Sequence, residues 1–176
     1  GLKWANALAA LPNGTGANSL ANAIELGDCF SFTLTPNAGE VSYDSIFVRV
    51  TVGANVQPAT TRFSLLSSVT GFSSSDALDT FDVSMSTSSS NGAETLDLSG
   101  LGEVEGPVEF RIYYHDVGPN PTHRVAIGKI FSPNGTPDLT VNGTVAGKRV
   151  SIPEPSTYAG LLGLVAFGAA MLRRRI

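Results

Sequence analysis

The sequence is poor in the residue types that build disulfide-stapled folds and most active sites. Cys29 is its single cysteine, so no internal disulfide can form. It has two histidines, His115 and His123, and it has neither a Gly-x-Ser-x-Gly nor a His-Glu-x-x-His motif. Only 15% of its 176 residues are charged, and the formal net charge is -4. An acidic chain without a basic stripe argues against nucleic-acid binding.

These absences predict a protein that is not an enzyme. A serine triad could be assembled around His115 and Asp116, but serines are so frequent in this chain that the coincidence carries little weight. We therefore expect no catalytic residues and no cofactor.

A series of aspartates also falls short of a metal site. Asp76, Asp79 and Asp82 recur at every third position, and clustered carboxylates are ligands that calcium prefers. On a strand, however, this spacing points neighbouring carboxylates to opposite faces. Turn-forming aspartates are the favoured interpretation, and no metal site is expected.

What the chain does contain is alternation. Apolar residues recur at every second position in short segments bounded by Gly, Pro, Asn and Ser, which is the pattern of half-buried strands. Strands are expected at residues 29–34, 41–43, 45–52, 62–67, 81–85, 96–98, 108–115, 124–130, 139–145 and 148–152. The pattern predicts an all-β fold, an antiparallel jelly-roll-like β-sandwich of about nine strands within a domain of residues 1–150.

One short helix is expected before the strands. Residues 19–26 are mostly helix formers, and either Asn18 or Ser19 can cap the start. Gly27 stands just past the end and favours termination there.

The last two dozen residues differ from everything upstream. Residues 151–157 form a Pro-rich linker that contains Pro153, Glu154 and Pro155, and its prolines hold the chain extended. The uncharged apolar run that follows is near the lower length limit for a membrane span. Residues 158–172 are therefore predicted to form a transmembrane helix. Its anchoring side chains are Tyr158, Leu161, Leu162, Leu164, Val165, Phe167, Met171 and Leu172.

Three arginines, Arg173, Arg174 and Arg175, close this segment. Because Lys and Arg beside a span favour the cytoplasmic side, we expect residues 173–176 in the cytoplasm and residues 1–150 outside it. An ordinary C-terminal tail anchor behind a Pro-rich linker would have the same order of parts, so two interpretations stay open.

Taken together, the Pro-Glu-Pro tripeptide at 153–155, the apolar run and the arginine cluster resemble the PEP-CTERM protein-sorting signal of Gram-negative bacteria. The resemblance implies recognition by an exosortase, an integral-membrane enzyme that cuts near the tripeptide. It further implies that the ectodomain is first anchored in the inner membrane, in the periplasm, and then passes to the cell surface or extracellular matrix. An association with exopolysaccharide and biofilm is implied as well.

The ectodomain also resembles a known group. Residues 30–39, 62–72, 96–101, 106–113 and 139–145 are similar to segments of the β-sandwich ectodomains commonly attached to PEP-CTERM tails. Those ectodomains are similar to lectin-like jelly rolls, so the resemblance implies a lectin-like fold.

The chain begins at Gly1 without a methionine, and residues 2–11 are too short and too interrupted for the apolar region of a signal peptide. An exported protein needs such a peptide. We therefore expect that it was removed or that the sequence is a fragment.

Three functions remain open. The first is a non-enzymatic surface or matrix protein sorted by an exosortase. The second is a carbohydrate-binding module, because Arg111, Tyr113 and His115 share the strand face opposite the predicted core, where such groups can stack on and hydrogen-bond a sugar. Ordinary cross-strand pairing explains the same pattern and is favoured. The third and weakest is a secreted hydrolase.

Overall fold

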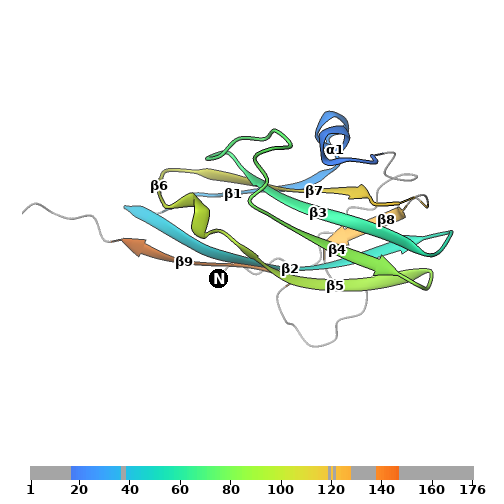
Figure 1. The fold of residues 1–176 in the computed structure, drawn as a ribbon. Coiled ribbons are helices and arrows are strands. Elements are labelled where there is room, and N and C mark those ends of the chain that lie inside the picture. Colours follow the sequence, from blue (N-terminus) through green and yellow to red (C-terminus); the bar gives the residue numbers. More distant parts are fainter. Residues whose placement is uncertain (1–16, 37–38, 119, 121, 128–137, 147–176) are drawn as a thin grey trace, which may run out of the picture.

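The structure is a computed structural model that describes residues 17–36, 39–118, 120, 122–127 and 138–146. Along the chain the elements are α1 (Leu20–Leu26), β1 (Cys29–Leu34), β2 (Glu40–Ala54), β3 (Ala59–Ser67), β4 (Asp79–Met85), β5 (Ser89–Asp97), the 3-10 turn η1 (Ser99–Leu101), β6 (Glu103–Glu105), β7 (Val108–Asp116), β8 (Thr122–Ile127) and β9 (Leu139–Ala146). The strands form two antiparallel sheets that lie face to face, and α1 covers the outer side of one of them (Figure 1).

The strand β2 is the centre of one sheet and is 15 residues long. Along one edge it pairs first with β6, over Glu40–Ser42, and then with β5, over Ser45–Gly53. Along the other edge it pairs with β9, from Glu40 to Val48, and with β8, from Val50 to Ala54. Its inward side chains Ile46, Val48, Val50 and Val52 are all 0% exposed. The predicted alternation of residues 45–52 is therefore confirmed.

The second sheet has the strand order β1-β7-β3-β4, and aromatic contacts join its strands to each other and to β2. Phe63 of β3 stacks on Phe81 of β4 with ring centroids 4.9 Å apart. Phe110 of β7 meets the ring of Tyr43 of β2 edge-on, at 5.5 Å and 84°. Such pairs add about 0.5–1.5 kcal/mol each beyond simple burial, so these rings help to fix the spacing of the two layers.

The sandwich is closed along the side where β4 is followed by β5. The backbone amide of Asp97 donates to Oδ2 of Asp79 at 2.9 Å, which links the two strands. Gly92 of β5 lies against Val83 of β4 so closely that a Cβ on Gly92 would overlap the Cγ2 of that valine. The absence of a side chain at position 92 therefore permits this close approach.

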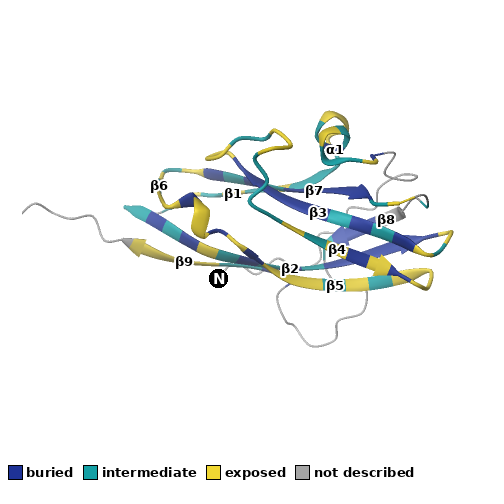
Figure 2. Ribbon diagram, in the orientation of Figure 1, coloured by how far each residue is buried: buried dark blue, intermediate teal, exposed yellow. Residues whose placement is uncertain are grey.

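The helix α1 begins and ends where the sequence indicates. The side chain of Ser19 caps its start by accepting a hydrogen bond from the Asn22 amide at 3.3 Å. Gly27 ends it in the left-handed conformation, with φ of 75°. Ala23 faces the sheet and is 0% exposed, whereas the opposite side of the helix faces solvent (Figure 2).

The prediction of antiparallel sheets with one short helix is confirmed, but several strand bounds are corrected. The predicted strands 41–43 and 45–52 are one strand, β2, whose pairing with β9 shifts register between Tyr43 and Ser45. The strand predicted at 96–98 begins at Ser89, and β6 was not predicted. Both errors concern strands that are largely exposed in Figure 2, so a two-residue apolar period is missing from their sequence.

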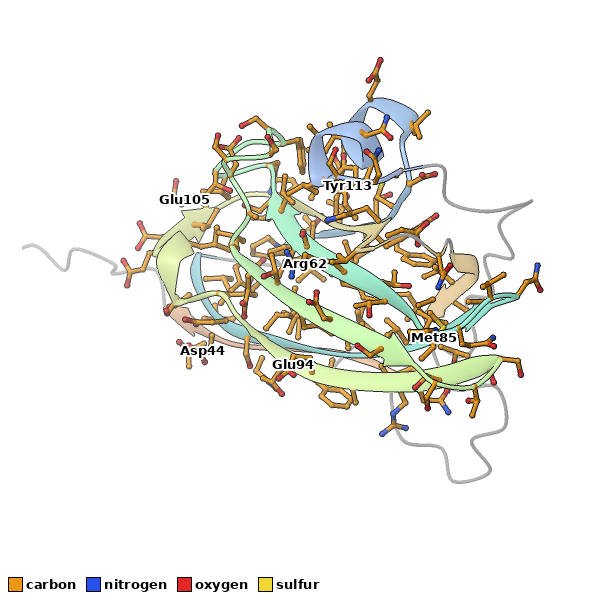
Figure 3. The ribbon with its side chains drawn as sticks, turned by 45° about the vertical axis from the view of Figure 1, so that its right-hand side comes forward. Asp44, Arg62, Met85, Glu94, Glu105 and Tyr113 are labelled. Atoms are coloured by element: carbon orange, nitrogen blue, oxygen red, sulfur yellow. The ribbon has the colours of Figure 1, made fainter. Side chains whose placement is uncertain are left out.

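Glu94 illustrates why β5 escaped prediction. It stands opposite Val48 in the register, on the core-facing side, yet it is exposed at the edge of the sheet. Figure 3 labels this residue on β5. A charged residue in an inward position breaks the alternation that identifies a strand.

Other expectations lie beyond the structure's reach. Residues 128–130 of one predicted strand, the predicted strand 148–152 and the predicted transmembrane helix 158–172 lie outside the described residues. Among the residues that are described, no helix has the length and apolar character needed to cross a membrane. A jelly-roll connection of the strands stays a prediction.

Replacing Gly92 with alanine is expected to lower the free energy of unfolding by about 1–3 kcal/mol, because the new methyl group must displace the buried, χ1-restricted Val83. Urea denaturation measures the effect. Gly100→Ala is the matched control, since a Cβ there meets nothing within 4 Å, and its effect should stay within about 0.5 kcal/mol. Equal effects of the two substitutions would contradict the close approach of β4 and β5.

Candidate functional site

The predicted sorting residues Pro153, Glu154 and Pro155, the anchor between Tyr158 and Leu172, and the arginine tail at 173–175 lie outside the described residues. The structure therefore bears on the other candidate site, the outer face of the sheet β1-β7-β3-β4.

Arg111, Tyr113 and His115 do share this outer face, as their alternation on β7 requires. The expectation of a solvated face is wrong for two of them, because Tyr113 is only 2% exposed and His115 only 7%. Tyr113 packs with Ala17, Ala23 and Leu66 in a second apolar cluster between α1 and the sheet. Figure 3 shows Tyr113 beside the helix.

Arg111 keeps partial exposure and has three aromatic or polar partners. Its Nε donates to Oε1 of Glu109 at 2.8 Å, and its Nη1 donates to the hydroxyl of Tyr113 at 3.2 Å. Its guanidinium carbon lies 3.9 Å from the ring centroid of Phe72, a cation–π geometry. The hydrogen bonds from Glu109 and then Tyr113 raise the pKa of Arg111 above its usual range. The result is a fixed positive charge on an aromatic ring at the edge of the covered face.

His115 occupies a different environment on the same face. In the register it stands opposite Arg62 of β3, and Arg62 donates from Nε and Nη2 to the two carboxylate oxygens of Asp82 at 2.7 and 2.8 Å. The Nδ1 of His115 is buried and has no hydrogen-bond partner among the described residues. Burial, and then the positive charge of Arg62, lower the pKa of His115 against the opposing carboxylates of Asp82 and Asp116.

The triad considered around His115 and Asp116 is not assembled by the described residues. The two are neighbours on β7, so their side chains point to opposite faces of the sheet. The amide of Asp116 donates to the carbonyl of Ala17 at 3.0 Å, which uses its backbone to hold the segment that leads into α1.

The three aspartates at 76, 79 and 82 serve separate structural roles. Asp76 shapes a turn by accepting hydrogen bonds from the amide and the hydroxyl of Ser73, which also lower its pKa. Asp79 accepts the amide of Asp97, and Asp82 pairs with Arg62. Within the part of the chain that the structure describes, no three His, Cys, Asp or Glu side chains gather as a metal site would require.

Cys29 stands opposite Tyr113 in the register, at the point where β1 begins beneath α1. Burial raises the pKa of its thiol, and this outweighs the nearby charge of Arg111 and a hydrogen bond from Tyr113. The thiol is therefore protonated at neutral pH, which makes it a poor nucleophile.

Sequence reasoning missed the two apolar residues that organise this face, Leu66 and Phe72. A signal existed for the first. Leu20, Ala23 and Ile24 form an apolar stripe on α1, so the helix needs an apolar partner, and Leu66 is the apolar residue in an outward position of β3. The sequence alone did not say that α1 would lie there.

Comparison with known proteins identifies the C-terminal segment. Residues 151–175 match the PEP-CTERM protein-sorting motif. The resemblance inferred from the Pro-Glu-Pro tripeptide, the apolar run and the arginines is thus confirmed, and the motif implies an exported protein sorted by an exosortase. No curated protein and no solved structure matches the chain.

Replacing Tyr113 with alanine is expected to lower the free energy of unfolding by about 3 kcal/mol, because it empties the space between α1 and the sheet. Tyr113→Phe is the control: it keeps the ring and removes only the hydroxyl that Arg111 contacts, so it should lower stability by about 1 kcal/mol. Denaturant midpoints compare the two. An alanine variant as stable as the phenylalanine variant would show that the ring does not support α1.

Proposed function

Because the chain carries a PEP-CTERM sorting motif at residues 151–175, we propose that it is a non-enzymatic bacterial surface or matrix protein. Its C-terminal segment holds it in the inner membrane with the sandwich in the periplasm. An exosortase then processes it, and the sandwich passes to the cell surface or to the extracellular matrix with its exopolysaccharide. The single observation that carries this proposal is the sorting motif.

The position of the last described strand supports a cargo that is separate from its signal. β9 ends at Ala146, paired with Glu40 of β2, so the sandwich closes before the motif begins at residue 151. Each residue of an extended chain spans at most about 3.6 Å. The processing enzyme therefore works close to the end of the sandwich that holds β6 and β9.

The state of the reactive side chains supports a role without catalysis. The imidazole of His115 is buried, and Arg62 across the sheet disfavours its protonation. The thiol of Cys29 is protonated at neutral pH. A general base or nucleophile needs both access and a pKa matched to its task, and these two groups have neither.

Carbohydrate binding is the second candidate, and Arg111 is the observation that favours it. Its side chain is 32% exposed and lies on Phe72, which is itself partly exposed. Glu109 beside it supplies carboxylate oxygens. An aromatic ring with a guanidinium and a carboxylate offers the stacking and hydrogen-bonding groups that a sugar requires. The buried Tyr113 and His115 would act through their support of this group.

The sorting proposal predicts that Glu154→Ala, or deletion of Arg173–Arg175, leaves the full-length protein in the inner-membrane fraction. The substitution alters the tripeptide, and the deletion removes the charges that set orientation. Expression in a host with an exosortase, followed by fractionation and mass measurement, tests this. Glu103→Ala, a carboxylate removed from the exposed β6, is the control and should be processed normally. Unchanged mass and destination in both altered proteins would refute exosortase handling.

The carbohydrate candidate predicts saturable signals on a glycan array that fall at least about tenfold in Arg111→Ala and Phe72→Ala, because both remove one half of the stacked pair. Arg62→Ala removes an arginine from the same face without touching Phe72, and it is the matched control. A silent array supports the non-binding surface protein. Binding that survives both substitutions would place any sugar elsewhere.

A further inference from the structure

Residues 17–28 leave and rejoin the sheet at the same strand. At one end the amide of Asp116 donates to the carbonyl of Ala17 at 3.0 Å, and at the other the amide of Tyr114 donates to the carbonyl of Asp28 at 3.1 Å. Between these two anchors the chain rises into α1 and lies across the outer face (Figure 3). The segment is thus fixed to β7 on both sides of His115.

The imidazole between the anchors lacks the partner that a buried polar group requires. His115 is 7% exposed, and its Nδ1 has no hydrogen bond among the described residues. On the adjacent strand the Oγ of Ser64, which is 1% exposed and points to the same face, also lacks one there. Buried groups without partners lower stability, so both gain when the cover over them opens to water.

The charges around His115 disfavour a second positive charge there. Arg62 faces it from β3, and Asp82 on β4 already accepts two hydrogen bonds from Arg62. Asp116 follows on the same strand, and Asp28 lies at the second anchor. A proton on the imidazole would therefore meet Arg62 in a poorly solvated space, with the Asp82 carboxylate already engaged.

We propose that residues 17–28 form an acid-released cover: protonation of His115 loosens the two backbone anchors that flank it, and α1 lifts from the sheet while the sandwich stays folded. Lifting the cover exposes Tyr113 and Leu66 and frees the single thiol, Cys29. These residues lie outside the main core between the sheets, so the sandwich does not depend on the cover for its own packing.

The direction of the pH effect follows from the closed and open forms. In the closed form the pKa of His115 is lowered, mainly by burial, whereas the solvated imidazole titrates near its ordinary value of about 6.5. Opening therefore takes up a proton, so the closed form is fully favoured above that value and loses stability as the pH falls toward the lowered pKa. Asp28 acts in the opposite sense, because burial and the charge of Asp116 raise its pKa and acid relieves that strain.

Amide hydrogen exchange between pH 7.5 and 5.0 tests the cover, with protection factors corrected for intrinsic exchange at each pH. In the wild-type protein, protection at residues 20–28 should fall by up to about tenfold for each pH unit below 6.5, since one proton drives opening, while residues 46–52 keep their protection. His115→Gln, whose side chain stays neutral, should hold protection at 20–28 constant. His123→Gln, at the chain's other histidine, should behave as wild type.

Two results overturn the proposal: constant protection at 20–28 in the wild-type protein, or an equal acid-induced loss in His115→Gln. If His115→Gln fails to fold, the imidazole of the wild-type protein is titrated by NMR, and Cys29 is labelled at each pH against the unfolded chain. The proposal requires that His115 takes up its proton in the pH range where protection at 20–28 is lost and Cys29 becomes reactive. Protonation of His115 without these changes refutes it.

Discussion

The fully buried face of β2 is the constraint on which the rest of this fold depends. A central strand must satisfy its backbone hydrogen bonds along both edges and bury its apolar side chains against the opposite layer. β2 does this over 15 residues with partners from four other strands. The second sheet is placed by packing on Ile46, Val48, Val50 and Val52, and that sheet in turn supports α1. The position of the candidate site is therefore set, two layers away, by four aliphatic side chains.

The parts of the fold that follow from local chemistry were predictable from the sequence. Strands with one buried face, such as β2 and β7, show a clean two-residue period, and α1 has a serine cap and a terminal glycine. β5 and β6 were mispredicted or missed because strands exposed on both faces need no apolar period. Alternation correctly placed Arg111, Tyr113 and His115 on one face. It could not show that α1 covers two of them, since contact between distant segments leaves no local period.

The sorting motif and the sandwich differ in the same way. The motif is a linear order of parts, namely prolines, an apolar run and arginines, so its chemistry can be read from neighbouring residues. Any role of the sandwich depends on side chains from separate strands and loops, as when Arg111 of β7 meets Phe72 from the loop after β3. This difference explains why the destination of the protein is better defined than its ligand.

Glu94 gives the sandwich a property that only matters when many copies are crowded together. An edge strand offers unpaired amides and carbonyls to any neighbouring chain, and an inward-facing charge on such a strand opposes that pairing. Among the described strands, β5 ends its sheet, and Glu94 holds a carboxylate there opposite Val48. A neighbour that extended the sheet at this border would have to desolvate that carboxylate. Copies that accumulate side by side are thereby kept from joining into continuous β-fibrils through this border.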